Sequence, residues 1–282
     1  IKIMNTNVTA KPELSKGKVI LSLIVLQCWA LIYGITVLLT GQQLKITHWL
    51  WAKKRYINRD KEFQKNGFRK FNLIDAKSWS QLSALVGKAF EEKGHAMVSK
   101  VDWAENKSLH LNLDESQEVN DFINQIIVSD NFIRQMNEIT GGSKWSLHSR
   151  QIWRNFPEDF NNDKKEINST FLHVDNGGSK EHRLILNIFM YLTVTDRDHG
   201  PFTFYDAPTS RKINRKYFLH ICRYGNLRKM DLTKRIEEEI KPNILITDLG
   251  QALLINNQEC LHRAGFCKKE HRDMLQIIIT TS

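Results

Sequence analysis

The C-terminal half of the chain is a series of short strand-like runs. From residue 146 onward, runs rich in β-branched and aromatic residues follow one another, separated by turn sequences such as His-Gly-Pro at 199–201. The runs cover residues 147–156, 170–175, 183–195, 201–206, 244–247, 251–256, 259–264 and 272–281. Eight short strands with one break in the series predict two antiparallel sheets packed face to face. We therefore expect a double-stranded β-helix, the cupin-like jelly roll, over residues 146–282.

Residues 63–145 carry helical periodicity instead. A capping box at Ser78 precedes apolar residues at helical spacing, and Gly94 ends that pattern. A second pattern covers residues 116–139, and the polar run 129–131 divides it in two. The sequence thus predicts a mainly β domain at 63–282, with N-terminal helices packed on the jelly roll.

Residues 19–39 are an apolar run without a single charge. A helix rises about 1.5 Å per residue, so this run can span a hydrocarbon core of about 30 Å. Segment 40–62 combines tryptophans with basic residues, which is typical of a membrane–water interface. We expect a single-pass transmembrane helix after a short tail at 1–18, with a cleavable signal peptide or a buried core helix as alternatives. The basic residues after the span favour a cytoplasmic domain.

The net charge of +10 is concentrated in two places. Residues 1–62 carry +7, and an insert at 207–241, which breaks the strand series, carries +6. This distribution argues against a nucleic-acid surface. We expect one helix in the insert, from Asp231 to Ile240. The insert is either an ordinary solvated face or a lid that favours an anionic substrate or an anionic lipid surface.

Three potential metal ligands stand out among the strand-like runs. His173 and Asp175 are two residues apart in the run 170–175, so their side chains point to the same face of a strand. His262 lies far downstream, with small residues two positions away on either side. Two imidazoles and one carboxylate fill one face of an octahedral iron(II) and leave three positions open. A His-x-Asp pair alone also fits a core histidine or a surface carboxylate.

Arg272 begins the last run, ten residues after His262. A polar turn at 268–270 predicts a hairpin that places Arg272 beside His262. There its guanidinium can bind the carboxylate of an organic acid through two parallel hydrogen bonds. The alternative is a surface arginine paired with Asp273 or Glu270.

The run 183–195 adds two further candidates. Asn187 and Tyr191 lie on one face of this predicted strand together with Phe189. Polar groups among aromatic rings are typical of a binding-pocket wall. Both residues are candidates for contact with a bound co-substrate, although Tyr191 fits a core position equally well.

The order of these residues resembles the iron(II)/2-oxoglutarate-dependent dioxygenases. Within that superfamily, the stretches 188–212 and 250–282 are similar to the phytanoyl-CoA dioxygenase-like group. The resemblance covers about residues 146–282. One departure is Ala-Pro-Thr-Ser-Arg at 207–211, which lacks the glycine and histidine of that group's Pro-Gly-Ser-His loop.

The resemblance implies a catalytic site with Fe(II), 2-oxoglutarate and O₂. His173, Asp175 and His262 would be the catalytic metal ligands. Arg272 would bind the distal carboxylate of 2-oxoglutarate, with Tyr191 and Asn187 nearby. The reaction would hydroxylate a C–H bond and release succinate and CO₂.

The substrate class follows less directly from the sequence. The apolar run and the basic insert favour a small-molecule or lipid-like substrate, with an anionic metabolite as one option. Two other functions stay open: a non-catalytic jelly-roll binding or scaffold protein, and a metal cupin enzyme that does not use 2-oxoglutarate. Arg272 argues against the second, since such an enzyme has no use for it. Nothing in the sequence defines an oligomeric state.

Overall fold

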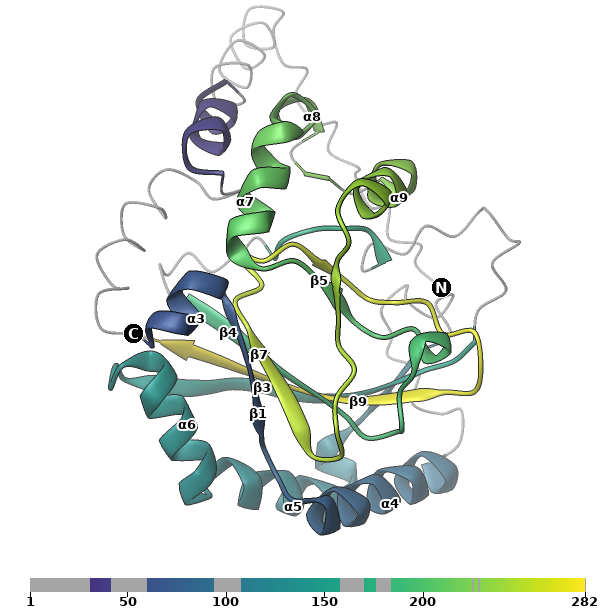
Figure 1. Ribbon diagram of the computed structural model, residues 1–282. Helices are drawn as coiled ribbons and strands as arrows, with labels where there is room; N and C mark the ends of the chain where they lie inside the picture. The colour runs from purple at the N-terminus through teal and green to yellow at the C-terminus, as the bar shows by residue number, and fades with distance from the viewer. Residues whose placement is uncertain are drawn as a thin grey trace, which may run out of the picture.

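The computed structural model describes residues 31–41, 60–93, 108–157, 170–175, 184–224, 226–227 and 229–281. Six strands form the large sheet: β1 (Phe68–Asn72), β2 (Ser108–Leu111), β3 (Trp145–Asn155), β4 (Leu184–Tyr191), β7 (Gln251–Ile255) and β9 (Arg272–Thr281). Three form the small sheet: β5 (Thr203–Phe204), β6 (Asn243–Ile244) and β8 (His262–Arg263). Their orders are β1-β7-β4-β9-β3-β2 and β6-β5-β8, and the paired strands are antiparallel (Figure 1). This confirms a mainly antiparallel β fold with two sheets.

Two strands come from the region that was predicted to be helical. β1 pairs with β7 and β2 pairs with β3, so they occupy the two edges of the large sheet. The division into a helical part at 63–145 and a β core at 146–282 therefore does not hold for these strands. Their sequences, FRKFN and SLHL, are short, and each contains only two apolar residues. Two apolar residues are too few to distinguish a strand from other structure, so the pattern did not reveal them.

The predicted helices are present in this N-terminal part. They are α4 (Ala76–Lys93), α5 (Gln117–Ile127) and α6 (Asp130–Thr140). A further helix, α3 (Lys61–Asn66), precedes them and was not predicted. Asp75 rather than Ser78 caps α4, since Asp75 Oδ1 accepts a hydrogen bond from the Ser78 amide at 2.7 Å. The predicted break is confirmed, because Ser129 caps α6. Gly141 ends α6 in the left-handed conformation, and Gly94 lies outside the described residues.

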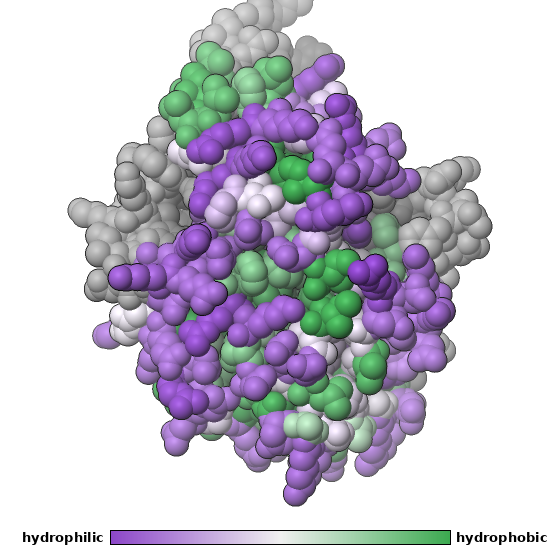
Figure 2. Space-filling view, viewed as in Figure 1, coloured by the Kyte–Doolittle hydropathy of each residue, from purple (hydrophilic) through white to green (hydrophobic). Residues whose placement is uncertain are grey.

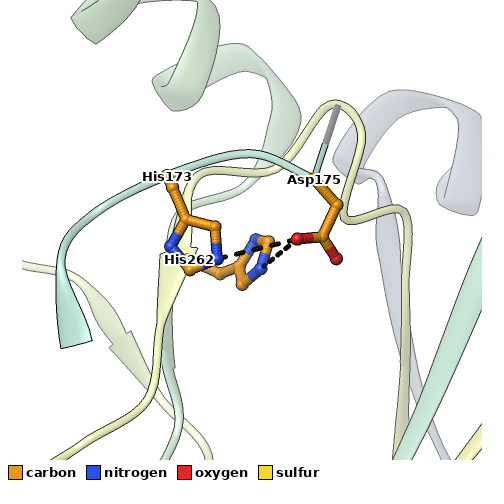
Figure 3. A group of neighbouring side chains, drawn as sticks. All are labelled: His173, Asp175 and His262. Atoms are coloured by element: carbon orange, nitrogen blue, oxygen red, sulfur yellow. Dashed lines mark ion pairs between the residues drawn. The ribbon is translucent and has the colours of Figure 1, made fainter. Parts of the chain in front are cut away.

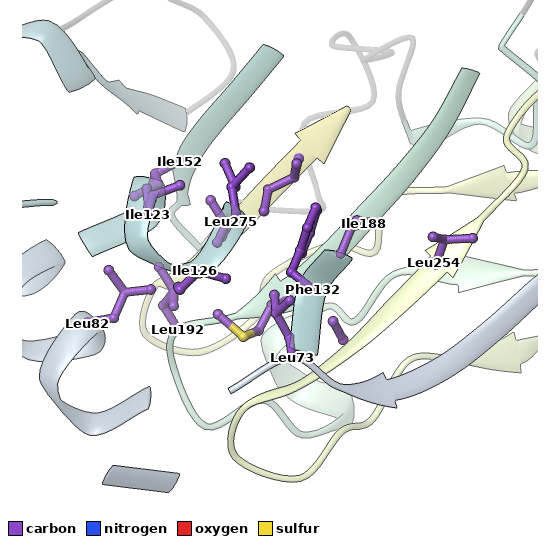
Figure 4. Close-up of a cluster of buried hydrophobic side chains, with 14 of the residues drawn as sticks. Leu73, Leu82, Ile123, Ile126, Phe132, Ile152, Ile188, Leu192, Leu254 and Leu275 are labelled. Carbon is purple, nitrogen blue, oxygen red and sulfur yellow. The ribbon is translucent and has the colours of Figure 1, made fainter. Parts of the chain in front are cut away.

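The main core lies between these helices and one face of the large sheet. α4, α5 and α6 run along that face at the bottom of Figure 1. Fully buried side chains of the helices meet those of the strands, as Figure 4 shows for Leu82, Ile123, Phe132, Ile152, Ile188 and Leu275. Each such side chain stabilises the fold by about 1.5–3 kcal/mol relative to leaving it exposed. The opposite face of the sheet is left for the small sheet.

The insert forms three helices rather than one. The predicted helix is confirmed as α9 (Met230–Glu239), and it follows α7 (Ala207–Lys216) and α8 (Phe218–Tyr224). α7 escaped prediction because Ile213 is its only large apolar residue, so it shows no hydrophobic periodicity. The three helices pack on the small sheet through Ile213, Ile221 and Ile236, which form a cluster with Leu172, Val174 and Leu261.

Residues 31–40 are helical, and they include the last nine residues of the predicted membrane span at 19–39. Residues 1–30 and 42–59 lie outside the described residues, and with them most of the predicted span and of the basic segment at 40–62. Within the described part of the chain, no helix has both the length and the apolar character needed to cross a bilayer. Helix 31–40 contacts the domain, because Asn214 on α7 donates to the Gly41 carbonyl at 2.9 Å.

Candidate metal centre

His173 and His262 lie directly opposite each other in an antiparallel bridge. The amide of each donates to the carbonyl of the other, at 3.0 and 2.9 Å. Opposite residues of an antiparallel pair project their side chains to the same face, and the two imidazole centroids are 4.4 Å apart. The run 170–175 contributes only this bridge rather than the predicted strand. One bridge is enough to bring together two histidines 89 positions apart in the sequence.

Asp175 completes the group. Its Oδ1 lies 3.6 Å from Nε2 of His173 and 3.7 Å from Nε2 of His262 (Figure 3). The potential ligand atoms of the three residues all lie within 4.8 Å of one another. The three side chains that were predicted to converge therefore do so.

The hydrogen bonds of the two imidazoles define which nitrogen carries the proton. His173 Nδ1 lies 2.6 Å from the Phe171 carbonyl, and His262 Nδ1 lies 2.9 Å from the Cys260 carbonyl. A carbonyl oxygen only accepts, so both Nδ1 atoms are protonated and the neutral rings carry their lone pairs on Nε2. Two lone pairs then face a carboxylate oxygen. A metal cation would stabilise this arrangement, and metal-binding histidines typically donate Nδ1–H to a backbone carbonyl in the same way.

Asp175 is ionised at neutral pH. Burial alone would raise the pKa of its carboxyl group, but the positive charge of the His262 and His173 imidazoles in their protonated form, together with the amide of Asn257, outweighs burial and lowers it. A bound metal cation would supply that positive charge when the imidazoles are neutral. The Asp175 side chain is 46% exposed, whereas the histidines are almost fully buried. The carboxylate therefore lies on the open side of the group.

Asn257 supports Asp175 and was missed in the sequence. Its Nδ2 donates to Oδ2 of Asp175 at 3.0 Å, and its carbonyl accepts from the Asp175 amide at 2.9 Å. Oδ1 of Asp175 is left to face the two histidines. The sequence offers only an Asn-Asn pair after a strand-like run, which is a common turn signal and does not point to a ligand.

Helix α9 holds the histidine bridge from behind. Thr233 Oγ1 accepts from the Leu172 amide at 3.0 Å. Glu237 accepts two hydrogen bonds from Arg263, at 2.6 and 3.0 Å. Leu172 and Arg263 are each the neighbour of a histidine, so their side chains point away from the imidazoles, and the Leu172 side chain packs in one cluster with Ile236 of α9. These contacts place α9 behind the bridge, whereas the alternative in the sequence was a lid over the site.

Arg272 is buried in the domain, but the predicted hairpin is not what places it there. β8 pairs with β5 in the small sheet, whereas β9 pairs with β3 and β4 in the large one. The predicted hairpin between the runs 259–264 and 272–281 is therefore wrong. The segment between them crosses from one sheet to the other, and a polar turn in the sequence does not distinguish a crossover from a hairpin.

Arg272 is a buried guanidinium that forms no ion pair within the described residues. It is 2% exposed, and Nη2 donates to Oδ1 of Asn155 at 3.0 Å, while Nε is buried without a hydrogen bond. The predicted alternative of a surface pair is wrong, because Asp273 binds Arg154 at 2.7 Å. A buried charge without a counter-charge is costly. An anionic ligand would offset that cost.

Tyr191 and Asn187 lie on the face of β4 that turns toward the small sheet. Asn187 accepts from Gln276 at 2.8 Å, and Tyr191 Oη accepts from the Phe202 amide at 2.6 Å. Burial raises the pKa of Tyr191, although the charge of Arg272 opposes this, so the hydroxyl keeps its proton. The Phe202 ring stacks on His262 with centroids 5.5 Å apart. Tyr191, Phe202 and His262 therefore form a continuous layer of contacts, which links the surroundings of Arg272 to the two histidines.

The fold is shared with solved structures. HygX from Streptomyces hygroscopicus, with nickel and 2-oxoglutarate bound, is 11% identical and has a TM-score of 0.53, over 78% of this chain and 85% of that chain. EctD from S. alaskensis is 10% identical with a TM-score of 0.50, over 78% and 74%. EvdMO1 is 13% identical with a TM-score of 0.50, and this chain covers 48% of it.

The sequence comparisons add no family. No protein-family model matches the sequence, and no curated protein matches it significantly. At 10–13% identity the structural likeness concerns the fold, and it does not distinguish the phytanoyl-CoA dioxygenase-like group from others. The chain therefore has the fold of HygX, a protein whose structure contains nickel and 2-oxoglutarate, with a His-Asp-His group inside it.

Proposed function

We propose that the protein is an Fe(II)/2-oxoglutarate-dependent dioxygenase that hydroxylates a C–H bond and releases succinate and CO₂. The observation that carries the proposal is the convergence of His173, Asp175 and His262, with both Nε2 lone pairs aimed at one carboxylate oxygen. The fold supports it, since HygX holds nickel and 2-oxoglutarate on a similar framework.

The ligand set fits ferrous iron. Nε2 of the two histidines and a carboxylate oxygen of Asp175 would occupy one face of an octahedral ion, with three positions left for 2-oxoglutarate and O₂. When bound, iron with these two co-substrates supplies the oxidising power for C–H hydroxylation. Asn257 keeps the carboxylate aimed at the metal.

The other residues would bind the co-substrate and exclude water. Arg272 would pair with the distal carboxylate of 2-oxoglutarate, which provides the counter-charge that the described protein residues do not. Tyr191 would donate its hydroxyl proton to the same carboxylate, because its oxygen already accepts from the Phe202 amide. Asn187 and the phenylalanine rings would line the wall and keep bulk water out.

The proposal includes attachment to a membrane through the apolar run at 19–39, as a single span with the domain on the cytoplasmic side. A substrate delivered at a membrane would be lipid-like or a small molecule, and the basic insert favours an anionic one. The stretches 188–212 and 250–282 support placement in the phytanoyl-CoA dioxygenase-like group.

The test is anaerobic loading of the detergent-solubilised full chain with Fe(II), followed by 2-oxoglutarate and then O₂. We expect iron binding, a visible charge-transfer band on adding 2-oxoglutarate, and succinate on adding O₂. Asp175→Ala and His262→Ala should abolish iron binding and succinate. Arg272→Ala should keep iron binding but require far more 2-oxoglutarate, while Arg150→Ala, on β3, serves as its control.

Three outcomes would contradict the proposal. Full succinate formation by Asp175→Ala would remove the metal site from the reaction. Iron binding without 2-oxoglutarate consumption would favour a cupin enzyme of another kind. Failure of the folded chain to bind iron would favour a binding or scaffold protein.

A further inference from the structure

Exposed apolar side chains gather on one surface, formed by helix 31–40 and α8. We name it the α8 face. Of the twelve large apolar side chains that are exposed in the described part of the chain, seven belong to it: Leu31, Ile32, Ile35, Leu38, Leu39, Leu219 and Tyr224. Leu219 and Leu39 are each 71% exposed. Figure 2 shows this apolar surface at the top, bordered by hydrophilic residues. An exposed apolar patch of this kind marks a docking surface rather than scattered exposure.

The α8 face is fixed to the domain. The opposite side of helix 31–40 is buried at Val37, and Gly34 lies directly against Cys222 on α8, where a larger residue would overlap the sulfur. Arg215 on α7 donates to the Leu39 carbonyl at 3.3 Å. The helix therefore has one side attached to the insert and one side free of the described residues, and α8 continues that free side.

Cations without an ion pair in the described part of the chain lie on α7 and α8 and just after them. The sequences of α7 and α8 contain five basic residues and no acid. Lys212, Arg215, Arg223 and the nearby Lys229 are exposed, and the described part of the chain offers none of them an ion pair. Lys229 Nζ lies 4.1 Å from the ring centroid of Tyr224. Apolar side chains bordered by cations match a bilayer with anionic headgroups.

A second copy of the chain fits this surface less well. Two copies joined through the α8 face would bring two sets of unpaired cations together, and like charges at an interface are repulsive. The sequence also leads the apolar run of residues 19–30 directly into helix 31–40. Residues 31–39 of this helix are the last part of the run 19–39 that is proposed to enter the membrane, and α8 lies directly against them through Cys222.

We propose that helix 31–40 and α8 form a membrane-docking face for anionic phospholipids. The folded domain itself, and not only the apolar run at 19–39, would contact the bilayer. Leu219 and Tyr224 would enter the boundary between headgroups and acyl chains, with Arg223 and Lys229 at the phosphates. The proposal extends the membrane attachment in the proposed function and does not depend on catalysis.

The first test measures how deeply position 219 on α8 lies in the bilayer. The full chain is placed in nanodiscs of phosphatidylcholine with phosphatidylserine, with a spin label carried by a genetically encoded residue at position 219 or 249. Leu249 is also exposed, at 46%, but its neighbour Gly250 accepts from the Leu73 amide just before α4. α4 and α8 lie at opposite ends of the domain (Figure 1). We expect the label at 219 to be accessible to O₂ and protected from a water-soluble nickel reagent, and the label at 249 to show the reverse. Aqueous accessibility at both positions would overturn the proposal.

The second test removes charge. Each basic residue near an anionic surface contributes about 1 kcal/mol, so Arg223→Gln with Lys229→Gln should lower the docking equilibrium constant at position 219 by roughly 30-fold. Lys77→Gln, on an exposed position of α4, should leave it unchanged. An unchanged constant in the double variant would overturn the role of anionic lipid.

Two further outcomes separate the explanations. A lipid-free dimer in analytical ultracentrifugation that Leu219→Glu dissolves would assign the surface to a second copy and overturn the proposal. A label at 219 that is buried in lipid, in a protein that forms no succinate, would support the docking face and contradict only the proposed function.

Discussion

The two sheets of the domain are held together in different ways. In the large sheet, β3 and β9 pair from Trp145 and Thr281 to Asn155 and Arg272, over a core of fully buried aliphatic side chains. In the small sheet each strand has two residues, and His173 adds a single bridge. Side-chain contacts from α9 and Asn257 position the ligands there. Stability and metal binding should therefore depend on different residues.

Ile277→Ala tests the large sheet and should have the largest effect on stability. Ile277 is fully buried on the central strand β9, so the cavity should cost about 2–5 kcal/mol of unfolding free energy. Iron affinity of the protein that remains folded should not change. Denaturant unfolding and calorimetric titration with Fe(II) under anaerobic conditions measure the two quantities.

Leu172→Ala is the matched substitution on the small-sheet side. Leu172 is also fully buried, but it lies between His173 and the cluster beneath α9. This variant should lower iron affinity as well as stability. Equal iron affinity in the two variants would show that the two regions are not separable.

Asn257→Ala tests whether the Asn257 side chain orients the Asp175 carboxylate. Losing a hydrogen-bond partner of a metal ligand typically costs about 10–100-fold in metal affinity. We expect a loss in that range, with a small change in unfolding free energy because the backbone contact to Asp175 stays. Asn137→Ala is the control: it removes the side-chain oxygen that accepts a hydrogen bond from Trp145 Nε1, and it should not alter iron affinity. A similar loss in both variants would contradict a positioning role.

Thr233→Val tests the support that α9 gives to the bridge. Without the hydroxyl, the buried Leu172 amide has no acceptor, which costs about 1–2 kcal/mol. Residues 171–175 should then exchange their amide hydrogens faster, and iron affinity should fall by up to about tenfold. Thr233→Ser should restore both. Exchange that is faster only in the large sheet would argue against this support.

The sequence predicted that His173 and Asp175 lie together because the geometry that joins these two residues is local. A spacing of two residues in an extended segment puts His173 and Asp175 on one side regardless of the rest of the fold. The side chains that share each face of β4 and β9 were also predictable, since successive residues of a strand point to opposite faces. The break at Ser129 and the helix at 230–239 carry ordinary capping and periodicity signals.

The missed features depend on pairing between distant segments. The partner of β8 is β5 rather than β9, and only the arrangement of the two sheets decides this. Asn257 became important because the loop that carries it folds back on Asp175, 82 positions earlier. β1 and β2 are short edge strands, and they adopt the β conformation because they pair with β7 and β3. None of these contacts produces a hydrophobic periodicity in the sequence of the segments that form it.

The smallest expected effect concerns pH and the edge of the large sheet. Burial lowers the pKa of His110 on β2 from 6.5 to about 4. As the pH falls, His110 is therefore protonated in the unfolded chain before it is protonated in the folded protein. Its contribution to the free energy of unfolding is complete above pH 6.5 and is lost as the pH falls toward 4. The loss should be on the order of 1 kcal/mol, since His110 is only partly buried and solvent screens its charge. His110→Gln should remove this part of the acid sensitivity, as measured by urea midpoints across that range, while iron binding at neutral pH stays the same. An unchanged pH dependence in the variant would mean that the acid sensitivity arises elsewhere, with the carboxylates as the next group to examine.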